Sequence, residues 1–259
     1  MSRPTHWAAG RYDAVGDRIA PIGAEVVAAA RQRCQFTDVV DLACGTGSAA
    51  IAAAAAGARV TGVDITPELI AIAAEKAARA GHDVTWVTAD AADTGLPDAS
   101  FDAVVSNMGV IFVEPRAQVA EIARLLKPRG VVAFSAWVRD PANPFFRPVV
   151  DVLGPPQNRG HSPDQWGEAD TVAGWLAADF DDTTFETSSH TWQLGPLSDA
   201  VTWVVHESPI HVSLFASIDD EGTRERLQAA FEDEFRRCLD GDGNVSYDAP
   251  YVVVTARRR

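Results

Sequence analysis

The stretch from Val39 to Gly47 reads VVDLACGTG, and more than any other part of the chain it decides the fold. The apolar residues around Asp41 predict a buried strand, and Gly45 and Gly47 follow the end of that strand directly. Glycine allows a sharp turn, and the missing Cβ lets the backbone come close to a ligand. A helix that begins after this turn presents free N–H groups to the same ligand. The stretch therefore predicts a strand, a glycine loop and a helix that bind a ligand together.

Strands and helices alternate along the first half of the chain. Apolar and β-branched runs predict strands at 38–43, 59–63, 84–88, 101–106 and 131–137, and helical spacing predicts helices at 47–56, 67–80 and 116–126. This alternation is typical of parallel strands joined by crossover helices. Further strands are predicted at 183–193 and 245–256, and further helices at 199–207 and 223–239. The sequence thus predicts an α/β fold with a seven-stranded, mostly parallel sheet.

The composition changes after Trp137, where prolines crowd a stretch that also contains several aromatic residues. A flexible linker seldom carries so many aromatic side chains, so we predict an irregular or helical lid over residues 139–182. The other predicted parts are N-terminal cap helices at 1–30, a ligand-binding core at 31–138 and a C-terminal part at 183–259 that completes the sheet. Because 259 residues suffice for one large core, we expect a single structural domain.

The charge and the cysteine content exclude several classes of protein. The formal net charge is −14 and the dense basic run is confined to the last three residues, so we expect no nucleic-acid partner. Three cysteines without CxxC spacing predict neither a disulfide framework nor a zinc site, which fits a reducing compartment. No signal peptide is evident, and the apolar run at 49–56 is far shorter than the roughly 20 residues of a membrane span. We expect a cytoplasmic protein with no membrane span and no metal.

Two further carboxylates follow the next two predicted strands. Asp64 ends the second strand, about 20 residues after Gly45, the spacing at which nucleotide-binding proteins place an acid on the ribose. Asp90 follows the third strand, where its carboxylate can accept from an adenine amino group while the Ala91 N–H donates to the ring. Ligands bind beyond the carboxyl ends of parallel strands, so these residues predict a nucleoside site without specifying which nucleoside.

Four motifs in this order resemble one family. DLACGTG, VTGVDIT, TADAADTGLPDASFD and EIARLLKPRG are similar to the motifs of class I S-adenosylmethionine-dependent methyltransferases, in particular the ubiquinone- and menaquinone-biosynthesis-like group. The resemblance covers residues 12–137, and Tyr12 resembles the tyrosine that helps close the cofactor pocket. It implies a Rossmann-like sheet with an antiparallel last strand, S-adenosylmethionine as cofactor and S-adenosylhomocysteine as product. One departure is Arg129, where the family usually has glycine, and we expect it to alter a turn rather than the chemistry.

The resemblance also implies roles for single residues. Asp41 would lie near the methionine moiety of the cofactor, Asp64 would bind the ribose and Asp90 the adenine. Asn107 and Met108 match the segment that runs beneath the reactive methyl group. The full predicted cofactor set is Tyr12, Asp41, Ala43, Gly45, Gly47, Asp64, Ile65, Asp90, Ala91, Asn107 and Met108.

The acceptor side of the site is less defined by the sequence. Five aromatic residues are candidates for the walls of an acceptor pocket, and ordinary core packing would explain about three of them: Phe112, Trp137, Phe145, Trp166 and Trp203. His206 and His211 are candidate general bases, although a surface or core-edge role is the simpler account of a histidine and is favoured. Cys44, beside the glycine loop, is better explained by packing than as a nucleophile.

The predicted reaction is O- or C-methylation of a small, lipophilic or aromatic metabolite, driven by positioning and desolvation. The protein would act as a monomer or homodimer. A noncatalytic nucleoside- or S-adenosylmethionine-binding protein is an alternative, because it would keep the same site without turnover. An NAD-dependent oxidoreductase is a further alternative, disfavoured because Ala50 stands where the dinucleotide fingerprint has its third glycine and no hydride-transfer residues are evident.

Overall fold

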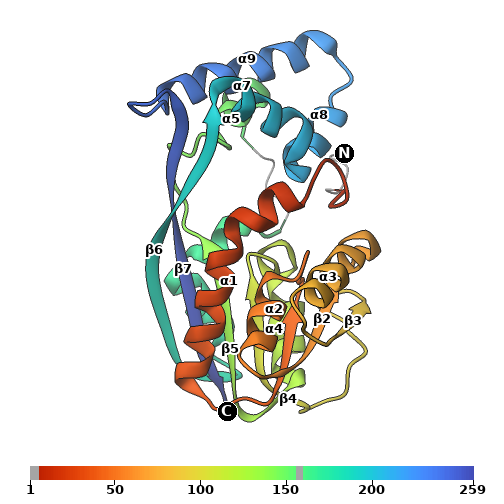
Figure 1. Cartoon of the computed structure of the whole chain (residues 1–259). Helices are drawn as coiled ribbons and strands as arrows, with labels where there is room; N and C mark the ends of the chain where they lie inside the picture. The colour runs from red at the N-terminus through yellow and green to blue at the C-terminus, as the bar shows by residue number, and fades with distance from the viewer. Residues whose placement is uncertain (1–5, 156–159) are drawn as a thin grey trace. The chain divides into compact units, whose positions relative to one another are not determined.

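The computed structural model of the chain describes residues 6–155 and 160–259, and its contacts divide the chain into two compact units (Figure 1). The larger unit consists of Ile19–Arg139, Gly160–Ser188 and Pro250–Arg259. The smaller unit consists of Met1–Arg18, Asp140–Arg159 and Ser189–Ala249. Residues 1–5 of the predicted cap and 156–159 of the predicted lid lie outside the described residues. These two units are defined by contacts between residues and do not test the predicted division of the sequence. The division into cap, core, lid and C-terminal part therefore stays a prediction.

A seven-stranded sheet with the order β3-β2-β1-β4-β5-β7-β6 confirms the predicted fold class. Its strands are β1 (Asp38–Leu42), β2 (Arg59–Asp64), β3 (Val84–Thr88), β4 (Phe101–Asn107), β5 (Leu126–Trp137), β6 (Phe180–Pro196) and β7 (Asn244–Arg258). The pairs β1–β2, β2–β3, β1–β4 and β4–β5 are parallel, and β7 runs antiparallel to β5. The long strands β6 and β7 run side by side (Figure 1), and each contributes residues to both units.

The helices differ from the predicted ones mainly in the later part of the chain. They are α1 (Asp13–Arg33), α2 (Ser48–Ala55), α3 (Pro67–Arg79), α4 (Pro115–Leu125), α5 (Arg147–Leu153), α6 (Ala169–Leu176), α7 (Leu197–Thr202), α8 (Pro209–Ala216) and α9 (Glu221–Arg237). Short 3-10 turns lie at Val110–Phe112 (η1) and Pro163–Gly167 (η2), and a wider π turn, η3 (Trp203–Glu207), continues α7. The proline-rich stretch predicted as a lid therefore contains α5, η2 and α6.

The strand predicted at 131–137 begins five residues earlier in the structure. Leu126 already pairs with Phe101 of β4, and the register then shifts before Val131 pairs with Ala103. Pro128 lies in this irregular part, where a missing backbone N–H costs no regular ladder bond. The strand and the preceding helix α4 are thus directly joined, which the proline and glycine signals in the sequence did not reveal.

The side chain of Trp86 in β3 explains why two residues beside it are glycine. A Cβ at Gly62 of β2 would lie 2.3 Å from Trp86 Cζ3, and a Cβ at Gly47 would lie 2.9 Å from Trp86 Cη2. The indole therefore occupies the space above β2 and reaches the residue that precedes α2. Gly47 also has a φ of 86°, so both its backbone conformation and its surroundings require glycine.

The smaller unit has a core of aromatic rings. The ring of Phe145 contacts those of Trp192, Trp203, His211, Phe235 and Tyr247 at centroid distances of 5.3 to 6.3 Å. Edge-on and tilted arrangements of this kind stabilise aromatic clusters beyond simple burial of area. Helices α5 and α7 pack against α9 around this cluster.

The contact between Gly62 and Trp86 gives a first prediction. Gly62→Ala is expected to lower the free energy of unfolding by about 1–3 kcal/mol, because the new methyl group overlaps the half-buried indole ring of Trp86. The matched control is Gly174→Ala in α6, where no atom lies within 4 Å of the added Cβ and the helix gains about 0.5–1 kcal/mol. Denaturant unfolding of both variants measures the difference, and equal stabilities would contradict the packing argument.

Candidate functional site

The carboxyl ends of β1 and β4 lie next to each other at the point where the strand order reverses. The chain leaves β1 toward β2 and β3 on one side and returns to β4 on the other. In parallel sheets this arrangement opens a crevice beyond the strand ends, where ligands bind. Asp41, Asp64 and Asn107 all stand at or next to such ends in the larger unit.

The glycine loop after β1 is a run of unusual backbone conformations. Ala43, Gly45 and Gly47 have positive φ angles of 50°, 54° and 86°, and the Cys44 N–H donates to Val63 O at 2.9 Å. This hydrogen bond ties the loop to β2, and the chain turns sharply at Cys44. The N–H groups of Gly45 and Gly47 are also engaged, with Asp64 Oδ2 at 2.8 Å and Cys44 O at 2.9 Å, so these donors hold the loop in its shape.

Asp64 connects the end of β2 to this loop. Its carboxylate accepts from the Gly45 N–H at 2.8 Å and from the Thr66 N–H at 2.9 Å, and the side chain is only 7% exposed. Burial raises the pKa of Asp64, against the effect of these hydrogen bonds. A carboxylate has about four acceptor sites, so capacity remains for the hydroxyl groups of a ribose. The neighbouring Ile65 is 60% exposed, which places a large apolar side chain in the open beside this acid.

Asp41 is the more deeply buried of the two acids, at 1% exposure. Its Oδ2 accepts from the Ala50 N–H of α2 at 2.8 Å, and its Oδ1 has no hydrogen-bond partner among the described residues. Burial raises the pKa of Asp41 to about 8, and the nearby charge of Asp64 adds to this effect. A buried carboxylate oxygen without a partner fits a ligand that brings a positively charged group.

The segment after β4 passes directly over the glycine loop. Met108 has a φ of 56°, and a Cβ at Gly109 would lie 2.2 Å from Ala43 O. The Asn107 Nδ2 donates to Ser48 Oγ and to Ile19 O, both at 3.0 Å. The structure therefore brings together Ala43 and Asn107 with its neighbour Met108, as the predicted cofactor set requires.

Asp90 and Ala91 follow β3 as predicted, in two different environments. The Asp90 side chain is exposed, and its Oδ1 accepts from the Ala92 N–H at 2.8 Å. Ala91 is buried, and its carbonyl accepts from the Nε2 of Gln118 in α4 at 3.0 Å. Gln118 thus fixes the turn that carries the predicted adenine contacts, and it has no signal in the sequence because only the folded chain places α4 there.

The remaining predicted residues fall into both units. Tyr12 belongs to the smaller unit, where its ring lies edge-on to Trp7 at 6.3 Å. Phe145 and Trp203 belong to the aromatic core of the same unit. In the larger unit Phe112 is exposed, Trp137 is half-buried, and Trp166 is fully buried with its ring 5.4 Å from that of Phe134. The predicted role of Tyr12 toward the cofactor and those of the other five residues toward an acceptor stay predictions.

The two candidate bases lie in the smaller unit in contrasting surroundings. His206 is exposed on the turn η3, whereas His211 is buried in α8. The Nε2 of His211 lies 3.0 Å from the Phe145 carbonyl and its Nδ1 lies 2.7 Å from Ser208 Oγ. Because a carbonyl can only accept, Nε2 carries the proton and Nδ1 accepts from the hydroxyl. Burial lowers the pKa of His211 to about 4, so the ring is neutral at pH 7 with both nitrogens engaged.

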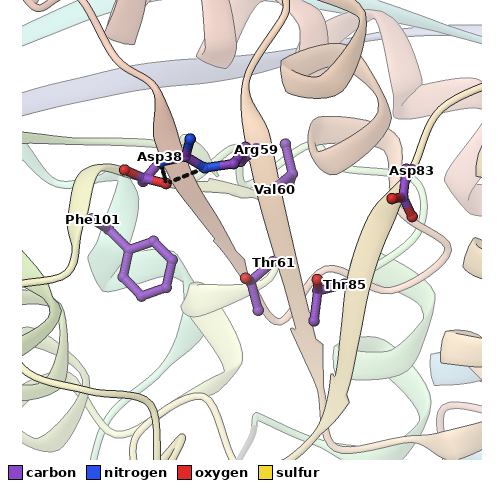
Figure 2. Close-up of a pocket in the computed structure, with 7 residues that line it drawn as sticks. All are labelled: Asp38, Arg59, Val60, Thr61, Asp83, Thr85 and Phe101. Carbon is purple, nitrogen blue, oxygen red and sulfur yellow. Dashed lines mark hydrogen bonds and ion pairs between the residues drawn. The ribbon is translucent and has the colours of Figure 1, made fainter.

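A pocket of about 320 Å³ lies at the opposite, amino-terminal edge of the sheet (Figure 2). Its lining residues are Asp38, Arg59, Val60, Thr61, Asp83, Thr85 and Phe101. Asp38 and Arg59, the first residues of β1 and β2, form an ion pair at 2.7 Å. Since catalytic sites of parallel sheets lie beyond the carboxyl ends, this pocket is not part of the candidate site.

The described residues also bear on metal sites and on membrane spans. Within residues 6–155 and 160–259, no cluster of three or more His, Cys, Asp or Glu side chains could hold a metal ion. Over the same described ranges, no helix is both long and apolar enough to cross a membrane.

A comparison with protein families gives a match over the part of the chain that carries the site. Residues 40–134 match the family model described as a methyltransferase domain. This range contains Asp41, the glycine loop, Asp64, Asp90 and Asn107. The predicted resemblance to class I S-adenosylmethionine-dependent methyltransferases is therefore confirmed for this domain.

Similar proteins cover the chain only in part at the level of sequence. An uncharacterized protein of Mycobacterium tuberculosis is 34% identical over 174 residues, which is 65% of this chain and 62% of that protein. A demethylmenaquinone methyltransferase of Clavibacter sepedonicus is 32% identical over 158 residues, or 54% of this chain and 63% of that enzyme. The chain thus spans less than two thirds of the length of these relatives.

Solved structures show the same fold at lower sequence identity. The geranyl diphosphate C-methyltransferase of Streptomyces coelicolor A3(2), solved with Mg²⁺, geranyl diphosphate and S-adenosyl-L-homocysteine, has a TM-score of 0.53 and 18% identity. The match covers 94% of this chain and 80% of that one. It confirms the Rossmann-like methyltransferase fold.

The buried position of Asp41 predicts an unusual dependence of stability on pH. Its pKa is about 8 in the folded chain and near 3.8 in the unfolded chain, so the folded state binds the extra proton between these values. The free energy of unfolding of the ligand-free protein should include a contribution that is complete below about pH 4 and is lost as the pH rises to about 8. Asp41→Asn should remove this decline, which has a slope of up to about 1.4 kcal/mol per pH unit.

The test compares thermal unfolding of the wild type and the Asp41→Asn variant between pH 4 and 8. Asp102→Asn is the control with the opposite sign. Despite partial burial, hydrogen bonds from Lys127 and from the Thr37 and Asp38 N–H groups lower the pKa of Asp102. Its contribution is therefore lost toward acid pH instead. Parallel stability curves for wild type and Asp41→Asn would contradict the assignment.

Proposed function

We propose that this chain is an S-adenosylmethionine-dependent methyltransferase that methylates an oxygen or carbon atom of a small, largely apolar acceptor. The observation that carries the proposal is the convergence of Asp41, Asp64 and the glycine loop at the sheet's switch point, with Asp41 Oδ1 buried and without a partner. A pocket for an uncharged nucleoside would have no use for Asp41 Oδ1. A ligand with a cationic amino acid part supplies a donor for this oxygen.

The chain's own residues fit the parts of this cofactor one by one. Asp41 would face its methionine portion, Asp64 would accept from the ribose hydroxyls, and Asp90 with Ala91 would take the adenine. The exposed Ile65 offers an apolar surface beside Asp64, which suits a flat base. When bound, S-adenosylmethionine supplies an electrophilic methyl group, and binding, orientation and exclusion of water are what the chain has to contribute.

Positioning is the main catalytic contribution in this proposal. Holding two reactants in a productive geometry can lower the activation barrier by about 7–11 kcal/mol. A general base raises the rate by about 10²- to 10⁴-fold, which is a smaller effect. The surroundings of His211 support this balance, because burial lowers its pKa to about 4 and its basic Nδ1 already accepts from Ser208 Oγ. His206 is exposed and stays a candidate base for acceptors that must lose a proton.

The proposed acceptor is lipophilic or aromatic. The exposed Phe112 in η1 follows Met108 by four residues and presents an apolar ring at the end of β4. Demethylmenaquinone methyltransferase among the relatives and geranyl diphosphate C-methyltransferase among the solved structures support an acceptor of this class. The net charge of −14 disfavours a nucleic acid as the acceptor, and we place the protein in the cytoplasm as a monomer or homodimer.

The proposal is tested first by ligand binding. S-adenosylhomocysteine at about 100 times its dissociation constant should stabilise the protein by about 2.7 kcal/mol, seen as a rise in Tm, and NAD should not. A rise with NAD alone would make the protein a nicotinamide enzyme. A rise with S-adenosylhomocysteine without transfer of a tritiated methyl group to any acceptor in a lipophilic metabolite library would make it a noncatalytic binding protein.

Asp64 provides the second test. Asp64→Ala should weaken S-adenosylhomocysteine binding by at least about tenfold, because it removes both a ribose acceptor and the bond to the Gly45 N–H. Asp83→Asn, an exposed acid at the opposite edge of the sheet, is the matched control and should bind like wild type. Titration calorimetry measures both, and unchanged affinity in a folded Asp64→Ala variant would refute the assignment.

A further inference from the structure

Ser135 is a hydroxyl group in the buried, mostly apolar stretch Val131–Ala136 of β5. It lies in β5 between Phe134 and Ala136, and all three side chains are 0% exposed. Buried hydroxyl groups need hydrogen-bond partners, and within a strand the backbone groups are already paired. The partners of Ser135 therefore indicate what this side chain does.

Both hydrogen-bonding functions of Ser135 are directed at the end of the neighbouring strand β4. Its Oγ accepts from the Met108 N–H at 3.0 Å and donates to Asn107 Oδ1 at 2.9 Å. Asn107 is also the residue that pairs with Ser135 in the register of the two strands. Met108 has a positive φ, a backbone conformation that residues other than glycine rarely adopt. One hydroxyl group thus holds the turn in which β4 leaves the sheet.

Asn107 extends this contact to the glycine loop. Because its Oδ1 accepts from Ser135, its Nδ2 faces Ser48 Oγ and Ile19 O, each at 3.0 Å. Ser48 is the first residue of α2 and directly follows Gly47. A continuous series of side-chain hydrogen bonds therefore runs from β5 through the end of β4 to the start of α2.

A second serine holds the other side of the same turn. Ser106 Oγ donates to Leu42 O at 2.7 Å and accepts from the Val110 N–H at 3.1 Å. Ser106 ties the turn to β1, whereas the contacts of Ser135 are the ones made with Asn107 and Met108. These two residues are the segment expected beneath the transferable methyl group, so the two serines differ in what they position.

We propose that Ser135 is a positioning residue that sets the place of Asn107 and Met108 against the methyl group of the cofactor, and so makes the site distinguish S-adenosylmethionine from S-adenosylhomocysteine. The inference rests on the proposed function. In this proposal the segment after β4 contacts the methyl group, which S-adenosylmethionine carries and S-adenosylhomocysteine lacks. Loss of the hydroxyl group frees this segment while Asp41, Asp64 and Asp90 keep their own contacts.

The experiment measures dissociation constants of both ligands by titration calorimetry. Ser135→Ala should weaken binding of S-adenosylmethionine by about tenfold and of S-adenosylhomocysteine by less than about threefold. Thr255→Val is the matched control, because Thr255 is a buried hydroxyl in β7 of the same unit that bonds Thr184 at 2.8 Å. It should lower Tm by a similar amount and leave the ratio of the two affinities unchanged.

The outcomes separate the two proposals. A wild-type protein that binds neither ligand overturns the proposed function. A wild type that binds both, with an unchanged ratio in a folded Ser135→Ala variant, overturns the role of Ser135 alone. If Ser135→Ala does not fold, Ser135→Cys keeps a side chain of similar shape with a weak donor. An altered ratio in that variant supports the inference, and an unchanged ratio overturns it.

Discussion

Two buried carboxyl groups beside one glycine loop are the constraint on which the candidate site depends. Asp64 is bonded to the Gly45 N–H and Asp41 to the Ala50 N–H, so each acid holds a different end of the loop and its helix. Both of these bonds come from backbone N–H groups and not from basic side chains, and burial raises the pKa of both acids. The fold thus buries two acids whose ionised forms are unfavourable there, which is typical of sites whose ligand completes them.

The part of the site that the sequence could predict is the part encoded by local patterns. VVDLACGTG contains a strand, its end and a glycine turn in consecutive residues, and Asp64 follows at a spacing set by one helix and one strand. Ser135 and Gln118 escaped prediction because their partners, Met108 and Ala91, are brought to them only by strand order and helix packing. A hydroxyl inside VVAFSAW was the visible signal for Ser135, since an apolar strand has no need of it.

The later half of the chain shows a different limit of sequence patterns. Prolines and aromatic residues at 139–182 predicted an irregular or helical lid without the bounds of its helices; proline is well tolerated in the first turn of a helix, and α5 and η2 both begin in this way. Phe145 and Trp203, two of the five candidates for an acceptor pocket, pack in the aromatic core of the smaller unit, and their role toward an acceptor stays a prediction. The family match ends at residue 134, so this core lies in the part of the chain that relatives need not share.

The indole of Trp86 against Gly62 and Gly47 has a consequence for how such chains can diverge. A larger residue at position 62 becomes acceptable only if the ring at position 86 shrinks, because both compete for one volume. The same ring borders the residue before α2, so a change at 86 also alters the support of the loop. Among homologous sequences, glycine at 62 should therefore co-vary with tryptophan at 86, and the pair should persist where the second half of the chain has changed completely.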